Sequence, residues 1–254
     1  SDDDISSFVV ECKQSDGVWK SVSRTSTNLG VNLSGLTPEH DYVYRVIGYD
    51  KRSNRGTPSE EITVTTLKDT ICPKVTKITP DPGYFKSEIN LRFTAEDDYR
   101  VKSIEIQTST DKESWKTVSE IKTTGESAKC TFDCKLDLKN YEEGSVFVRA
   151  KVYDSYGNVT EDKDLTCYEY VVDRTAPVQP TGVTASSGET EGGSSFVNIS
   201  WNAITDDNSF AYYRVYKSNS ADGEFTLLKN NVKTVNTYDE NVDFSATYYY
   251  KVEA

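Results

Sequence analysis

Carboxylate and amide side chains gather in polar stretches between alternating apolar runs, and they are the residues of this sequence best suited to chemistry. Hard oxygen atoms of this kind are the ligands that Ca²⁺ prefers in proteins. The sequence therefore predicts a calcium site, if the fold brings the stretches together. Its candidate ligands are Asp69, Glu96, Asp97, Asp98, Asp154 and Asn158.

A second group with the same composition occurs later in the chain, where Asp206, Asp207 and Asn208 could meet Asp173. Such residues are also common in loops that bind nothing, because their side chains bond to nearby backbone and tolerate turns. The alternative for both groups is therefore that they are solvated turn residues.

Catalysis has little support in the sequence. The single histidine, His40, stands in the turn-like stretch 38–41, and a serine or cysteine triad would have to use it. A carboxylate pair could hydrolyse a glycosidic bond only in a cleft that shields one carboxyl and raises its pKa. We expect no catalytic residue here and no enzymatic activity in this segment, which leaves open a catalytic domain elsewhere in a longer parent chain.

Composition restricts the partners. The 254 residues carry a net charge of −12, whereas binding to nucleic-acid phosphates needs clustered Lys and Arg. No apolar stretch approaches the roughly 18 residues that span a bilayer. We therefore expect no nucleic-acid partner and no membrane insertion in this segment.

Alternation of apolar and polar residues predicts a chain of short strands. Val101 to Lys116 has the pattern of two strands joined by a turn, and similar hairpins occur from Phe8 and from Tyr212. The sequence shows no convincing amphipathic helix. The other predicted strands are 30–33, 42–49, 61–67, 74–78, 89–94, 128–138, 145–153, 165–172, 181–185, 196–202, 237–238 and 248–252.

Two similar five-residue stretches, here called seams, each follow a β-rich run and end in Pro before the next run begins. They are D-T-I-C-P from Asp69 and D-R-T-A-P from Asp173. Such stretches are typical of linkers between strand domains. We therefore predict three modules, 1–68, 69–173 and 174–254. Short antiparallel strands at this spacing favour a two-sheet sandwich for each module.

The stretch L-S-G-L-T-P-E-H-D-Y-V-Y-R-V-I-G-Y-D, Leu33 to Asp50, resembles the region of fibronectin type III domains where a turn delivers a Tyr to strand F. The resemblance implies that Tyr42, and Tyr248 in the last module, bond through their hydroxyl groups to nearby backbone. Trp201 resembles the core Trp of strand B in that family.

The middle module departs from this pattern, because Phe93 replaces the Trp and Val146 replaces the Tyr. It looks more like the bacterial immunoglobulin-like modules of surface proteins. In that topology the BC and FG loops share the end that faces the preceding linker, which would bring 96–98 and 154–158 to Asp69.

The resemblance also implies that the terminal modules are incomplete. Only seven residues precede the first hairpin, so module 1–68 would lack strands A and B, and module 174–254 would lack strand G. The chain also contains no Met. We expect the parent chain to continue in both directions, with neighbouring modules as partners.

The state of the five cysteines stays open. Cys130 and Cys134 would lie about 13 Å apart on one strand, too far for a disulfide without a bulge. Side-by-side strands A and G favour a pair between Cys72 and Cys167, and the alternative is reduced thiols that pack as small apolar residues. No spacing matches the C-x-x-C of zinc sites.

Taken with the resemblance, the sequence predicts a non-catalytic stalk, spacer or adhesive segment of a large bacterial extracellular or cell-surface protein. The alternative is a set of accessory modules in a secreted hydrolase that acts on polysaccharide or peptide. A protein or carbohydrate ligand would meet exposed aromatic residues, although cross-strand Tyr pairs are also ordinary sheet stabilisers. The candidates are Tyr168, Tyr212, Tyr216 and Tyr249.

Overall fold

The structure is a computed structural model that describes residues 4–25 and 29–254. Its regular elements in this part of the chain are β-strands and one short 3-10 helix, η1 (Asp162–Asp164). The predicted all-β fold class is therefore confirmed. Among the described residues, no helix has the length and the apolar character needed to cross a membrane.

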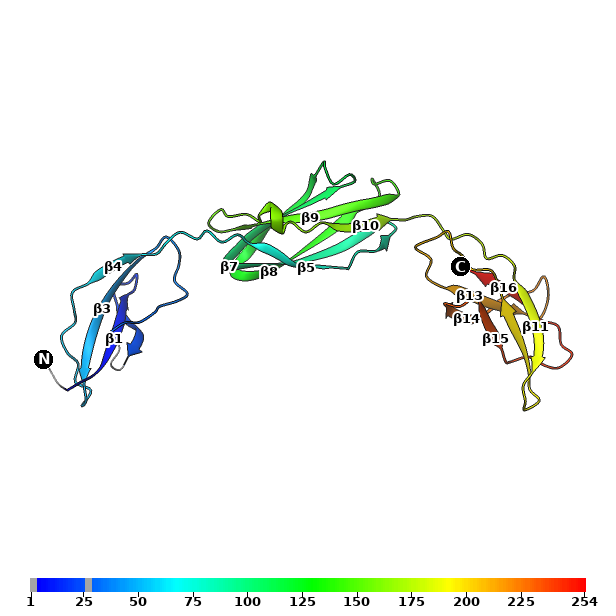
Figure 1. Cartoon of the computed structure of the whole chain (residues 1–254), viewed down its shortest axis with the longest axis horizontal. Helices are drawn as coiled ribbons and strands as arrows, with labels where there is room; N and C mark the ends of the chain where they lie inside the picture. The colour runs from blue at the N-terminus through cyan, green and yellow to red at the C-terminus, as the bar shows by residue number, and fades with distance from the viewer. Residues whose placement is uncertain (1–3, 26–28) are drawn as a thin grey trace. The chain divides into compact units, whose positions relative to one another are not determined.

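Sixteen strands follow one another in residues 4–25 and 29–254, and most of them can be found in Figure 1. Their bounds are β1 (Ile5–Lys13), β2 (Trp19–Thr25), β3 (Asp41–Asp50), β4 (Ile62–Thr65), β5 (Lys74–Thr79), β6 (Tyr84–Phe85), β7 (Glu88–Ser109), β8 (Lys116–Asp137), β9 (Gly144–Asp154), β10 (Tyr168–Val172), β11 (Thr184–Glu189), β12 (Ser195–Ser200), β13 (Tyr213–Ser218), β14 (Thr226–Val232), β15 (Asn236–Asp239) and β16 (Tyr249–Glu253).

The chain divides into two compact units. The first comprises Ser1–Asp81, Asn90–Lys135 and Phe147–Tyr168, and the second comprises Pro82–Ile89, Leu136–Val146 and Glu169–Ala254. Both units contain part of the predicted module 69–173, and the predicted module boundaries stay predictions.

The first sheet has the order β2-β1-β3-β4. Strand β1 pairs antiparallel with β2, as the hairpin pattern predicts, and also with β3. Val10, Cys12 and Tyr44 form its buried cluster, against which Leu33 and Tyr42 pack. The prediction of a strand over 30–33 is wrong, because this segment has no strand in the described chain. Within this segment, Leu33 packs against the buried cluster.

The middle sheet has the order β5-β7-β9-β10-β6, with β8 also paired to β7. Strand β7 changes partner along its length, since its residues up to Glu96 pair with β5 and its residues from Val101 pair with β9. Strands that bend in this way let one segment serve both layers of a sandwich. The predicted strand 89–94 and the first strand of the central hairpin are therefore one continuous element.

Buried side chains alternate with more exposed ones along residues 89–95 of β7 and 148–154 of β9, as a two-layer core requires. Phe93, which stands where the fibronectin pattern has Trp, is fully buried, and so is Val146. The other fully buried large side chains of this part are Ile89, Leu91, Val101, Ile104, Ile106, Val148 and Tyr170 in the sheet and Leu138 directly after β8.

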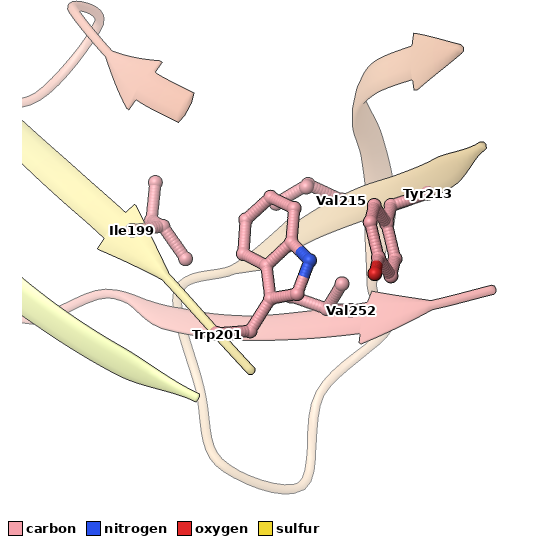
Figure 2. Packing of buried hydrophobic residues seen from close by; sticks show 5 residues of the cluster. All are labelled: Ile199, Trp201, Tyr213, Val215 and Val252. Carbon is pink, nitrogen blue, oxygen red and sulfur yellow. The ribbon is translucent and has the colours of Figure 1, made fainter. Parts of the chain in front are cut away.

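The last part of the chain forms two sheets, β11-β12-β15 and β14-β13-β16. Their core is a cluster of Ile199, Trp201, Tyr213, Val215 and Val252, which come from β12, β13, β16 and the residue after β12 (Figure 2). The indole of Trp201 lies against the Tyr213 ring at a centroid distance of 5.1 Å. Trp201 is therefore a core residue, as predicted.

Candidate metal centre

The bend of β7 supplies two of the predicted calcium ligands, Asp97 and Asp98. They lie in the short stretch between the residues that pair with β5 and those that pair with β9. Oδ2 of Asp97 accepts hydrogen bonds from the backbone N–H groups of Tyr99 and Arg100, at 3.0 and 2.9 Å. This side chain therefore stabilises the bend with one oxygen and leaves the other, Oδ1, for another partner.

Asp69 lies in the segment between β4 and β5, and it is only 7% exposed. Its Oδ1 accepts a hydrogen bond from the N–H of Ile71 at 3.0 Å. Its backbone oxygen accepts one from the side-chain amide of Asn158 at 3.2 Å. Asp69 is thus fixed at both its side chain and its backbone.

The structure brings Asp69, Asp97 and Asp98 together, with one carboxylate oxygen of each lying within 4.8 Å of the others. Asp69 is buried, Asp97 is half-buried and Asp98 is exposed. Burial raises the pKa of Asp97, against the effect of its two backbone hydrogen bonds, and the negative charges of Asp98 and Asp69 raise this pKa further. The three carboxylates therefore repel one another in a partly desolvated place.

Asp154 and Asn158 lie beside this cluster. Oδ1 of Asp154 accepts the N–H groups of Tyr156 and Asn158, and Oδ2 accepts the Asn158 amide at 2.6 Å. The Asp154 carboxylate is thus occupied by its own turn. It orients Asn158, which in turn holds the backbone of Asp69.

Glu96 is directed elsewhere, because it forms an ion pair with Lys129 on β8. This pairing, with a hydrogen bond from Lys129, lowers the pKa of Glu96. Among the described residues, Asp69, Asp97 and Asp98 are the one acidic group compact enough to hold a metal ion. At the second seam, Asp173 accepts the N–H of Thr175, and Asp207 accepts both the N–H and the hydroxyl of Ser209.

His40 is exposed, and its ring lies edge-on against Tyr42 at a centroid distance of 4.7 Å. No disulfide joins any two of the five cysteines in the described chain. The three clustered carboxylates can bind a cation, and calcium at this site stays a prediction.

A surface hollow in the last part of the chain contains residues that were not predicted to have a role. It is lined by Phe196, Tyr238 and Glu240 together with Ser and Thr side chains, and Tyr238 is 51% exposed. The rings of Phe196 and Tyr238 meet edge to face at 5.7 Å. The alternation of apolar and polar residues along 196–202 could have indicated that Phe196 points away from the core. Its contact with Tyr238 on β15 could not be predicted, because it depends on the tertiary fold.

The hydrogen bonds of Tyr42 bear on the family of the first part of the chain. Its hydroxyl accepts the backbone N–H of Thr37 at 2.8 Å, as the resemblance implied. Residues 1–65 match the family model described as the fibronectin type III domain. This part of the chain is similar to a fibronectin type III domain.

Solved structures with fibronectin modules are similar to the chain. The FN1–FN3 domains of chicken CNTN1 are 17% identical over 98% of this chain and 83% of that one, with a TM-score of 0.45. The fibronectin(III)-like modules of Clostridium thermocellum CbhA are 15% identical over 68% of this chain and 80% of that one, with a TM-score of 0.29. At these TM-scores neither similarity bears on function. No curated protein matches the chain significantly.

Proposed function

We propose that this chain is a non-catalytic structural and adhesive segment, a stalk or spacer, of a larger bacterial protein that is extracellular or at the cell surface. The observation that carries the proposal is the fibronectin type III match at residues 1–65, followed by further β-sheets. Modules of this family serve as connecting and binding units in multidomain proteins, so the expected partners are neighbouring modules and a protein or carbohydrate ligand.

The chemistry of the described residues supports a non-catalytic role. His40 is exposed in a turn and packs on Tyr42, and the Asp154 carboxylate is occupied by its own turn. General acid–base catalysis needs a group within reach of a bound substrate, and neither residue lines the hollows at Phe210, Asp133, Phe196 or Phe8.

The hollow at Phe196, Tyr238 and Glu240 favours a second candidate, accessory modules of a secreted hydrolase acting on polysaccharide. Aromatic rings beside carboxylate and hydroxyl groups suit the apolar faces and hydroxyls of sugars, because such sites combine apolar surface with a few polar groups that orient the ligand. In this case the segment would position a catalytic domain near its substrate.

Mapping the native polypeptide separates the two candidates. We would purify it from the producing cells, measure its intact mass and sequence the peptides that flank Ser1 and Ala254. Flanking repeats with a cell-wall or surface anchor are the expected result for a stalk. A flanking catalytic domain would overturn the stalk and establish the accessory role.

A further inference from the structure

Two carboxylate oxygens of the acidic cluster are buried without a hydrogen-bond partner in the described chain, namely Oδ2 of Asp69 and Oδ1 of Asp97. Burying a charged oxygen is costly unless it is paired, and nearly all buried polar atoms in native proteins have a partner. Asp69 is 93% buried, the complement of its 7% exposure. These two oxygens therefore call for a partner with positive charge.

Both side chains are already held in position. Asp69 is fixed through the bond from Ile71 to its Oδ1, and Asp97 through the bonds from Tyr99 and Arg100 to its Oδ2. In each carboxylate, one oxygen is occupied by backbone and the other is unpaired. Preorganised ligands of this kind lose little conformational freedom when they bind a cation.

Asp98 completes the group from the solvent side. Its carboxylate belongs to the same cluster within 4.8 Å, and the side chain is exposed. Water can therefore reach the site and fill the remaining coordination positions of an ion. A further layer is provided by Asn158, which donates to the Asp69 backbone and to Asp154.

We propose that Asp69, Asp97 and Asp98 bind one Ca²⁺ ion, which links the segment before β5 to the bend of β7. Ca²⁺ takes 6–8 oxygens at about 2.3–2.6 Å in flexible geometry, whereas Mg²⁺ needs a near-ideal octahedron and loses its water reluctantly. Three carboxylates from two separate segments, open to solvent on one side, suit the larger ion. The site goes beyond the spacer role, which does not depend on it.

Isothermal titration of Ca²⁺ into the full chain, after removal of divalent ions, tests the proposal. We expect one saturable site per chain with a Kd of about 10⁻⁴–10⁻³ M, the range of extracellular modules. Mg²⁺ should compete at least about tenfold more weakly. The proposal would be overturned if no saturable binding occurred at Ca²⁺ concentrations up to about 10⁻² M, ten times the upper limit of this range.

Variants assign the binding to these residues. Asp97→Asn keeps an oxygen for the N–H groups of Tyr99 and Arg100 but loses the charge, and it should weaken Ca²⁺ binding at least about tenfold. Asp98→Asn changes an exposed residue, so it should weaken binding without impairing folding. The control Asp81→Asn removes an equal charge from an exposed residue outside both acidic groups and should bind like the wild type. Unchanged affinity in both cluster variants would place any calcium elsewhere.

Discussion

The Tyr hydroxyls at residues 42 and 248 make the same local contact in two parts of the chain. Tyr42 accepts the N–H of Thr37 at 2.8 Å, and Tyr248 accepts the N–H of Asp243 at 3.0 Å. In both cases the partner lies five residues upstream. The contact could be predicted from sequence because the turn and the Tyr belong to one short motif.

Replacing Tyr42 by Phe should lower the free energy of unfolding of the first sheet by about 1 kcal/mol, because the N–H of Thr37 loses its acceptor. Urea denaturation of the full chain measures the change in the free energy of unfolding. Hydrogen exchange of the β3 amides in the native protein shows whether the change arises in the first sheet. Tyr44→Phe is the matched control, since the Tyr44 hydroxyl is buried without a partner and its removal should cost nothing. Equal effects of the two substitutions would contradict this role for Tyr42.

Asp239 and Lys217 form a buried ion pair between the two sheets of the last part of the chain. Nζ of Lys217 lies 2.8 Å from Oδ2 of Asp239, whose side chain is 0% exposed. The hydroxyl of Tyr250 also donates to this oxygen at 2.9 Å. Burial, and then the bond to Asp239, raise the pKa of Tyr250.

Asp239→Asn should destabilise this part of the chain by about 3 kcal/mol, because it leaves the Lys217 charge unpaired in a mostly buried position. The control substitution Glu253→Gln breaks an exposed ion pair, in which the Lys251 side chain is 56% exposed and the Glu253 side chain 41%. It should lower the free energy of unfolding by less than about 1 kcal/mol. Native-state hydrogen exchange of the β13 amides compares the two. A small loss for Asp239→Asn would mean that the pair is solvated.

Contacts between residues could be predicted from the sequence where they are local or follow from topology. Asp69 meets Asp97 and Asp98 because the two segments lie at the same end of the sheet. The ion pair of Glu96 with Lys129, 33 residues away, depends on strand register and could not be read from the sequence. The capture of Asp154 by its own turn did have a local signal, the D-S-Y-G-N stretch.

At the scale of elements, the main difference from the predicted strands is β7. Polar residues at 96–98 indicate a loop in the sequence, yet β7 continues through them from Glu88 to Ser109. The bonds from Tyr99 and Arg100 to Asp97 allow the strand to bend without breaking. A polar stretch inside a strand and a true loop have the same composition, so sequence alone could not separate them.

The two-residue strand β6 was also not predicted, and it pairs in parallel with the end of β10. Tyr84 and Phe85 lie opposite Val171 and Val172, and the N–H of Val171 donates to the oxygen of Gly83 at 2.9 Å. The chain enters the middle sheet at β5, continues into β6 and leaves after β10. Once β5 has detached from β7, tension along the chain would load the parallel β6–β10 bonds in shear. Several bonds then have to break together.

Val171→Pro removes the N–H that bonds to Gly83 and should lower the force at which the middle sheet unfolds. Pulling single molecules of the full chain measures this force, and the events from the other sheets in the same molecule are the internal control. An unchanged force for the middle sheet would show that the β6–β10 pairing does not resist tension.

At the scale of the whole molecule, the all-β class was predictable because alternation, turn residues and Tyr-rich strands all indicate sheets. The core of the last part was also predictable through Trp201. The pairing of β7 with both β5 and β9 was not, because it depends on contacts between distant segments. The fibronectin type III match covers residues 1–65. The later sheets lie outside this match, so their proposed roles are inferred from their structure.

A stalk or spacer has to bear tension through its folded sheets, and this requirement can be measured by extending single molecules of the full chain from both ends. We predict abrupt unfolding events, one of them releasing about 100 residues of the middle sheet, or roughly 350 Å of chain at about 3.5 Å per residue. Smooth extension without such events at any force would rule out a role as a load-bearing stalk or spacer.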